Sequence, residues 1–256
     1  MIRLSERLQG IADWIEPGSR VADIGTDHGY IPIWLKQTGR SDYIVAGDIH
    51  EGPLQKMRDH LDRWLEGDDS GIFLRKGDGL KVIGKGEADT AVIAGMGGLL
   101  MIDILSEDPE KTLSVKRFLL QPRNAQDKLR KWLLDNGFTI ADEKLVRESR
   151  FVWEILLVET EGAFGSPEEA LKKKEAYFKG AEEQYEIGQH LIRRKDPNLP
   201  DQIRWKQEIL QEILDGACRS DSTEAKERSR EIAEKLQSLE RILNYVNDER
   251  RTDPLY

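Results

Sequence analysis

The chain has 256 residues, of which 38% are hydrophobic and 34% are charged, and its formal net charge is −9. This acidic balance argues against a general nucleic-acid-binding protein, because contacts with phosphate need Lys and Arg, but it permits a local basic patch. With one cysteine, four histidines at no metal-ligand spacing, no signal peptide and no apolar run of membrane length, we expect a cytoplasmic protein of one or two domains without a disulfide, a metal or a membrane span.

The first predicted element is an amphipathic helix over residues 4–15, which Pro17 and Gly18 terminate. Arg7 stands off its apolar stripe, so we expect this side chain to lie on the surface. The stripe consists of Leu4, Leu8, Ile11, Ala12 and Ile15.

A strand, a tight glycine turn and a helix follow over residues 21–37. The start, Val-Ala-Asp-Ile, is typical of a buried parallel strand, and residues 30–37 have the apolar spacing of a helix with Pro32 in its first turn. Gly25 and Gly29 let the backbone turn sharply and approach a ligand closely, and the helix N-terminus offers free N–H groups. This turn is therefore the predicted cofactor site.

The residues of the turn indicate which cofactor is bound. A dinucleotide site needs a glycine-rich turn without acids, because pyrophosphate is anionic. Asp23 and Asp27 instead suit the ammonium and sulfonium groups of S-adenosylmethionine. Asp48, at the end of a second apolar strand, stands where a ribose diol is usually bound. The alternative is an ordinary strand–turn–helix that binds nothing.

Residues 51–65 are predicted to form a helix, and residues 72–80 a third strand that ends in Gly77-Asp78-Gly79. Asp78 is a candidate partner for the exocyclic amine of adenine. An Asp between two glycines is equally typical of a simple turn, so both interpretations stay open.

The remaining elements of this half alternate between strands and helices. Residues 88–94 are predicted as a strand that runs into Gly95-Met96-Gly97-Gly98 and a helix over 99–105, and residues 118–120 as a strand before Gln121-Pro122-Arg123-Asn124. A helix over 126–136 and two strands over 138–145 and 151–160, forming an antiparallel edge, complete the series. The pattern predicts a doubly wound, Rossmann-like α/β sheet.

Beyond this sheet the sequence becomes helical, and we place a domain boundary between residues 161 and 162. Apolar residues recur at alternating spacings of four and three, which predicts an antiparallel coiled coil. Three helices are expected, near residues 167–195, 200–216 and 223–250. Pattern alone favours a packed appendage or a dimerisation arm. Two basic clusters occur, Lys116, Arg117, Arg123, Lys128, Arg130 and Lys131, and Arg193, Arg194 and Lys195, and a solvated charged face is the preferred interpretation of either.

Several motifs, taken together, resemble the TrmK family of bacterial tRNA adenine-N1 methyltransferases, which act at position 22 of the tRNA. The resemblance covers the whole α/β domain, and the family's C-terminal coiled-coil domain matches the heptads. The motifs are Leu-Ser-Glu-Arg-Leu at 4–8, Ala-Asp-Ile-Gly-Thr-Asp-His-Gly-Tyr at 22–30, Gly-Pro at 52–53, Gly-Asp-Gly-Leu at 77–80, Ile-Ala-Gly-Met-Gly-Gly at 93–98, Leu-Gln-Pro at 120–122 and Leu-Arg-Lys-Trp-Leu at 129–133.

The resemblance implies a role for individual residues. Asp23, Gly25, Asp27, His28 and Gly29 are expected at the methionine end of S-adenosylmethionine, Asp48 with Ile49 at the ribose, and Gly77, Asp78 and Gly79 at the adenine. Gly95, Met96, Gly97 and Gly98 form the expected floor of the methyl-transfer site. Independently of the resemblance, Tyr30 is a candidate for stacking on the target base or, equally, a helix-start residue that packs on the sheet, and Gln121 and Arg123 are candidates for contacting base or phosphate. Many family members have Asn where this chain has Arg123.

We therefore expect an enzyme that methylates N1 of adenosine 22 in tRNA, acting as a monomer or weak dimer. Lys172, Lys173, Lys174 and the 193–195 cluster are candidate contacts with the tRNA body. Two alternatives stay open, a methyltransferase for a small molecule or protein, and a cofactor-binding adaptor without catalysis. Basic side chains near 116–131 on the same rim as Gly95 to Gly98 would favour the tRNA enzyme over the first alternative.

Overall fold

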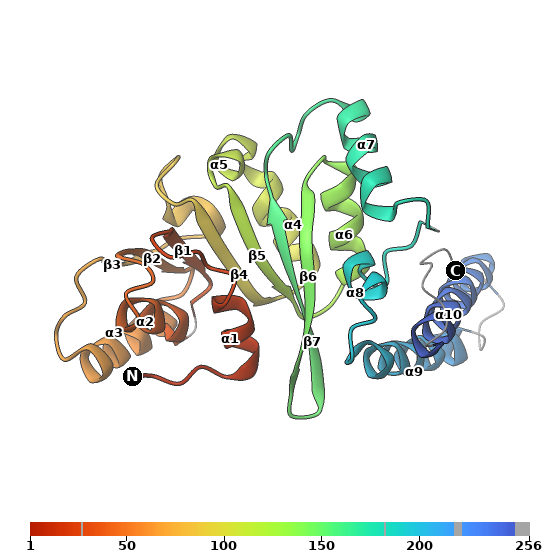
Figure 1. Ribbon diagram of the computed structural model, residues 1–256, viewed down its shortest axis with the longest axis horizontal. Coiled ribbons are helices and arrows are strands. Elements are labelled where there is room, and N and C mark those ends of the chain that lie inside the picture. The colour runs from red at the N-terminus through yellow and green to blue at the C-terminus, as the bar shows by residue number, and fades with distance from the viewer. Residues whose placement is uncertain (27, 182, 218–221, 249–256) are drawn as a thin grey trace. The chain divides into compact units, whose positions relative to one another are not determined.

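The structure, a computed structural model, describes residues 1–26, 28–181, 183–217 and 222–248 (Figure 1). It divides into two compact units, Met1–Lys174 and Glu175–Tyr256. The first unit holds the whole sheet, and the second holds the last three helices. The domain boundary predicted between residues 161 and 162 stays a prediction.

One seven-stranded sheet with the order β3-β2-β1-β4-β5-β7-β6 forms the centre of the first unit. All neighbouring strands are parallel except β7, which runs antiparallel to both β5 and β6. The predicted doubly wound sheet with an antiparallel pair at its edge is thereby confirmed. The strands are β1 Arg20–Ile24, β2 Tyr43–Asp48, β3 Ile72–Lys76, β4 Thr90–Met96, β5 Arg117–Pro122, β6 Thr139–Glu148 and β7 Phe151–Glu159.

Helices cover both faces of this sheet (Figure 1). On one face α2 contacts both α1 and α3, and on the other α4 packs against α6. Helices α2 and α3 have the predicted bounds, whereas α1 is shorter than predicted, because Ser5 caps its N-terminus, and α5 was not predicted. The helices are α1 Glu6–Ala12, α2 Tyr30–Gln37, α3 Glu51–Leu65, α4 Gly98–Glu107, α5 Pro109–Ser114 and α6 Gln126–Asp135, with a 3₁₀ turn, η1, at Gly79–Val82.

A glycine in the middle of α1 brings this helix close to the edge of the sheet. A Cβ atom on Gly10 would lie 2.7 Å from Cγ2 of Val146 on β6 and 3.1 Å from Cδ1 of Ile155 on β7. Residues three apart share a helix face, so Arg7 faces the same strands as Gly10. Close packing at Gly10 thus sets the position of Arg7.

The opposite face of the β6–β7 pair carries a buried ion network. Arg130 on α6 is fully buried; its Nε lies 2.7 Å from Oε1 of Glu143, and its Nη2 contacts Glu154. Such a network is held in place because separating one of its charges from the others in the interior is costly. Arg130, which the sequence placed in a solvated basic cluster, is therefore a core residue.

The chain after the sheet is helical but differs from the prediction at its start. The predicted helix over 167–195 is wrong in its middle, because α7 Pro167–Phe178 and α8 Gln189–Arg193 are separate helices. Lys179 and Gly180 have φ angles of 49° and 84°, and this left-handed backbone ends α7.

Helices α9 Leu199–Ala217 and α10 Thr223–Asn247 pack against each other in the second unit. The side-chain amide of Gln207 donates to Glu240 at 3.0 Å, and Ile203, Leu239 and Ile242 are buried. The predicted helical region is confirmed here, while coiled-coil packing stays a prediction. Among the described helices, none is both long enough and apolar enough to cross a membrane.

Candidate functional site

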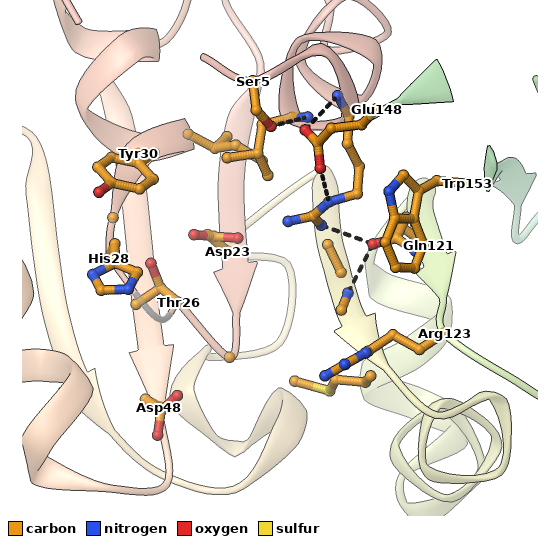
Figure 2. A pocket seen from close by; sticks show the side chains of 18 of the residues that line it. Ser5, Asp23, Thr26, His28, Tyr30, Asp48, Gln121, Arg123, Glu148 and Trp153 are labelled. Carbon is orange, nitrogen blue, oxygen red and sulfur yellow. Dashed lines mark hydrogen bonds and ion pairs between the residues drawn. The ribbon is translucent and has the colours of Figure 1, made fainter. Parts of the chain in front are cut away.

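A cavity of about 720 Å³ lies at the carboxyl ends of the parallel strands in the first unit. This volume falls within the range of small-molecule sites. Figure 2 shows Tyr30, His28 and Asp48 on one side and Glu148, Trp153 and Arg123 on the other. The cavity is lined by Arg3, Ser5, Arg7, Leu8, Asp23, Gly25, Thr26, His28, Gly29, Tyr30, Ile31, Asp48, Ala94, Gly95, Met96, Gln121, Arg123, Glu148 and Trp153.

Strand alternation explains why polar side chains gather there. Side chains two positions apart on a strand point to the same face of the sheet. Val21, Ala46 and Leu119 fill the core below α1 to α3. Two residues further along the same strands stand Asp23, Asp48 and Gln121, which line the cavity. Each of the three strands thus changes from apolar to polar on one face as it leaves the core.

The glycine turn after β1 forms one wall of the cavity. The N–H of Gly25 donates to the carbonyl of Gly47 at 2.8 Å, which fixes the turn to β2. Gly25 has a φ of 75°, and a Cβ there would lie 2.1 Å from the methyl carbon of Met96. Gly29, with a φ of 66°, caps α2. Both glycines are required by backbone conformation and by close contact. Asp27 lies outside the described residues.

Asp23 is the most deeply buried acid of the cavity. Burial raises the pKa of its carboxyl to about 6, the Thr26 side chain lowers it, and Asp48 raises it. The charged form is disfavoured because burial removes water, and the second carboxylate adds repulsion. A cation bound beside Asp23 would relieve both effects, so the pair of acids favours a positively charged ligand.

Asp48 lines the cavity, but the residues predicted to extend the adenine end do not. The backbone N–H of His50 donates to Asp48 Oδ1 at 2.7 Å, and Gly77 N–H donates to the Asp48 carbonyl at 3.0 Å. Asp78 is 55% exposed and lies 3.7 Å from Nζ of Lys81. Ile49, Gly77, Asp78 and Gly79 lie next to this edge of the sheet without lining the cavity. Their predicted contacts with adenine stay predictions.

Gln121 connects the floor of the cavity to α1. Its Oε1 accepts from Arg7 Nη1 at 2.8 Å and from the Gly95 N–H at 3.2 Å, so this amide is fixed by two donors. Gly95 and Met96 line the cavity, whereas Gly97 and Gly98 do not. A Cβ on Gly98 would lie 2.6 Å from the Ala125 carbonyl, so this glycine serves packing between loops.

Arg7 lies in the cavity and not on the surface, which corrects the prediction from the sequence. Its side chain is 24% exposed, Nε lies 3.8 Å from Glu148, and Cζ lies 5.8 Å from the Trp153 ring centre. Burial lowers the pKa of its guanidinium, Glu148 raises it, and Arg123 lowers it. Arg7 and Arg123 therefore place positive charge in the same part of the cavity. Gly10, at mid-helix, was the available signal, because it marks the buried face that Arg7 shares.

Three aromatic rings line the other side of the glycine turn. His28, Tyr30 and His60 lie with ring centres 5.3 to 5.6 Å apart and planes within about 21° of one another. His60 Nδ1 lies 2.9 Å from the carbonyl oxygen of His28, which ties α3 to the turn. Tyr30 is 37% exposed, as a residue that stacks on an incoming base must be. Nothing in the sequence near His60 predicts this contact.

The predicted basic clusters do not form common patches. Of the first cluster only Arg123 lines the cavity, since Arg130 is buried and Arg117 lies at the start of β5, near Glu16 and Glu159. In the region proposed to contact tRNA, Lys173 Nζ donates to the Gly137 carbonyl at 2.8 Å, Arg193 to the Tyr177 carbonyl, and Lys195 to the Asp248 carbonyl at 2.5 Å. These three cations are engaged in contacts within the protein.

The arrangement has two chemically distinct sides. The acids Asp23 and Asp48 stand at the glycine turn, and the cations Arg7 and Arg123 stand at the opposite wall, where Glu148 lies beside Arg7. A cationic cofactor fits the first side and an anionic or hydrogen-bonding substrate the second. Within the described residues no group of His, Cys, Asp or Glu is arranged to hold a metal ion.

Comparisons with known proteins identify relatives along the whole chain. A family model described as a methyltransferase domain matches residues 4–156. The tRNA (adenine(22)-N(1))-methyltransferase of Bacillus subtilis is 30% identical over 247 residues, which cover 95% of this chain and 98% of the relative. The crystal structure of the B. subtilis m1A22 tRNA methyltransferase TrmK gives a TM-score of 0.81 at 30% identity, covering 95% of this chain and 100% of that one. A putative tRNA (m1A22) methyltransferase from Streptococcus pneumoniae, in complex with S-adenosyl-L-methionine, gives 0.73 at 28% identity, covering 94% and 100%.

Proposed function

The chain belongs to the TrmK family of tRNA (adenine(22)-N(1))-methyltransferases, and from this premise we propose that it transfers a methyl group from S-adenosylmethionine to N1 of adenosine 22 in tRNA. One observation carries the proposal: the carboxyl ends of β1 and β2 bring Asp23 and Asp48 to one side of a cavity, and α1 and the end of β5 bring Arg7 and Arg123 to the other. That division matches a cationic cofactor and a polyanionic substrate.

The residues of the glycine turn fit S-adenosylmethionine. Asp23 and Asp48 supply the negative charge that an ammonium and a sulfonium need, and Asp48 is also suited to a ribose diol. Gly25 leaves the space that a Cβ would fill. Because a bound cation favours the ionised form of Asp23, cofactor binding should lower the pKa of this carboxyl below about 6. We assign Gly29 and His28 to the same end of the cofactor.

The reaction needs positioning more than acid–base catalysis. S-adenosylmethionine supplies an electrophilic methyl group on a sulfonium. Adenine N1 has an in-plane lone pair when the base is unpaired, so no general base has to remove a proton before attack. Orientation of the two reactants contributes roughly 7 to 11 kcal/mol in well-aligned cases. The task of the protein is to hold N1 in line with the methyl group.

The wall opposite the acids is assigned to the substrate. Arg7 holds Gln121, and Gln121 holds the Gly95 N–H, so this chain of hydrogen bonds fixes the floor on which the target base would rest. Arg123 is exposed at the rim and is suited to base or phosphate contact. Tyr30 is placed to stack on a base that has left its helix, since extruded bases are usually held between planar groups.

We further propose that the enzyme acts in the cytoplasm and as a monomer or weak dimer. Among the described residues, those that line the cavity come from elements of the first unit, which supports a site built within one chain. A single cysteine suits a reducing compartment.

The test is transfer of label from S-adenosylmethionine to unmodified tRNA, followed by nucleoside analysis. The expected product is 1-methyladenosine, and tRNA with guanosine at position 22 should stay unlabelled. Asp48→Asn should weaken cofactor binding. Asp42→Asn, the same chemical change at an exposed residue just before β2, should not. Cofactor binding without transfer to any tRNA would contradict the proposed activity. Equal labelling of the guanosine-22 tRNA would contradict the assignment of the methyl group to position 22.

A further inference from the structure

A line of four side chains, two aromatic rings between two arginines, leads out of the cavity along the β6–β7 hairpin. Cζ of Arg7 lies 5.8 Å from the ring centre of Trp153, the rings of Trp153 and Phe151 are 5.5 Å apart, and Cζ of Arg150 lies 4.9 Å from the Phe151 ring. We call these four residues the hairpin ladder. Its inner end lines the cavity and its outer end lies at the hairpin turn.

Strand lengths place this ladder beyond the rest of the sheet. Because β7 is antiparallel to both β5 and β6, the carboxyl end of β6 lies at the same edge of the sheet as the cavity. Strand β6 has 10 residues and β5 has 6, and β7 pairs with β5 only from Leu156 onward. The tip of the hairpin therefore extends past its neighbours (Figure 1).

The two aromatic residues share one face of β7, and folding does not explain the outer one. Phe151 and Trp153 are two positions apart, so they point to the same side as Glu148, which pairs with Phe151 and lines the cavity. Phe151 is 41% exposed, whereas Ile155, on the same face, is fully buried. An exposed ring flanked by an exposed arginine at the mouth of a site indicates a ligand with planar groups and negative charge.

Unpaired RNA has that chemistry. Bases stack on aromatic rings and on guanidinium planes whatever their sequence, and phosphates are contacted by nearby arginines. Arg3 and Arg123, both exposed, add positive charge at the same cavity. A base taken out of its helix leaves its neighbours without their stacking partner. The ladder begins where that base would enter.

We propose that the hairpin ladder binds the unpaired nucleotides next to the target adenosine, with a base stacked on Phe151 and a phosphate at Arg150. The inference rests on the proposed function, because it takes RNA to be the substrate. It goes further by assigning the contact to the β6–β7 hairpin of the first unit, at residues outside both basic clusters of the sequence.

The test is the affinity of the full-length protein for unmodified tRNA, with Phe73→Ala as the matched control. Phe73 on β3 is 40% exposed, its ring is 4.8 Å from Tyr43, and Arg75 lies 5.9 Å from it, so it repeats the local environment of Phe151 away from the cavity. Phe151→Ala should raise the Kd and KM for tRNA at least about fivefold, since one stacked base is worth that or more. Phe73→Ala should change neither.

Two further variants separate stacking from loss of structure and from charge. Phe151→Tyr keeps a planar ring and should bind tRNA as the wild type does, so weak binding by Phe151→Tyr would overturn the stacking assignment. Arg150→Gln should reduce the slope of log Kd against log salt concentration by about one. An unchanged slope would overturn the phosphate contact.

Cofactor affinity distinguishes the failure of this inference from the failure of the proposed function. If the wild type binds S-adenosylmethionine but neither binds nor methylates tRNA, the proposed function is wrong. If the wild type methylates tRNA and Phe151→Ala leaves Kd and KM unchanged, only the hairpin ladder assignment is wrong. A change of oligomeric state in Phe151→Ala with unchanged tRNA affinity would also overturn it, by identifying this surface as a protein interface.

Discussion

Replacing Asp23 by Asn should stabilise the protein while it damages the site. Burial raises the pKa of this carboxyl from 3.8 to about 6, so the folded state binds the proton more tightly than the unfolded chain does. The contribution of this carboxyl to the free energy of unfolding is therefore most favourable below about pH 4 and falls as the pH rises from 4 to 6. Above about pH 6 the whole cost of burying the charged carboxylate is present. About two pH units at about 1.36 kcal/mol each make this cost roughly 3 kcal/mol.

The assay is denaturant unfolding of both proteins at two pH values. At pH 8 Asp23→Asn should be roughly 1 to 3 kcal/mol more stable than the wild type, because the amide has no charge to desolvate but also loses the contact with Thr26. At pH 5 the gain should be smaller by about 1 to 2 kcal/mol, since the folded wild type is then mostly protonated. Comparing the two proteins at each pH cancels the titration of all other groups.

Asp42→Asn is the matched control, because Asp42 is exposed and the chemical change is the same. It should give a difference near zero at both pH values. The reasoning is refuted if Asp23→Asn is no more stable than the wild type at pH 8, or if its advantage is the same at pH 5. Asp23→Asn should also bind S-adenosylmethionine more weakly than the wild type, because it lacks the negative charge that a bound cation would stabilise.

Three further outcomes follow from the geometry. Gly25→Ala places a Cβ 2.1 Å from the Met96 methyl carbon, so cofactor affinity measured by calorimetry should fall. Gly39→Ala is the control, because Gly39 also has a positive φ but lies in open space; it should lose about 1 kcal/mol of unfolding free energy and keep its cofactor affinity. Arg130→Met removes the buried guanidinium that pairs with Glu143 and Glu154 and should cost about 3 to 5 kcal/mol of unfolding free energy at neutral pH, measured by denaturant unfolding. An unchanged free energy of unfolding would contradict it. Arg7→Lys keeps the charge but cannot reach Glu148 and Gln121 together, so kcat should fall roughly 10- to 100-fold with cofactor Kd unchanged; a changed Kd alone would contradict it.

Local patterns predicted that Asp23, Asp48 and the glycine turn come together, because most of these residues are close together in the sequence. The apolar run, the two glycines and the helix that follows belong to one stretch of residues 21–37, and strand alternation places Asp23 and Asp48 on one face. The bounds of α2 and α3 could be read from apolar spacing. The third strand ended early because Gly77 and Asp78 lead into a 3₁₀ turn, which a hydrophobic pattern does not distinguish from a strand end.

The opposite side could not be predicted in the same way, because it is assembled from distant segments. Arg7 meets Gln121 across 114 positions and Glu148 across 141, and only the sheet order brings them together. Trp153 belongs to a strand inserted between β5 and β6, an arrangement that element order along the chain does not reveal. The predicted long helix after residue 167 failed for a local reason, since Gly180 lay within an otherwise heptad-like pattern and its effect was underestimated.

This difference in assembly has a kinetic consequence. The acids are held by the glycine turn and by neighbouring parallel strands, whereas Arg7 and its contact with Trp153 depend on α1 packing against the β6–β7 hairpin at Gly10. A Cβ at Gly10 would push α1 away from Val146 and thereby move Arg7, without touching Asp23 or Asp48. Gly10→Ala should therefore raise KM for tRNA and lower kcat while the Kd for S-adenosylmethionine stays within about twofold, a separation that direct damage to the glycine turn cannot produce. Parallel losses in both affinities would show that the two sides are one cooperative unit.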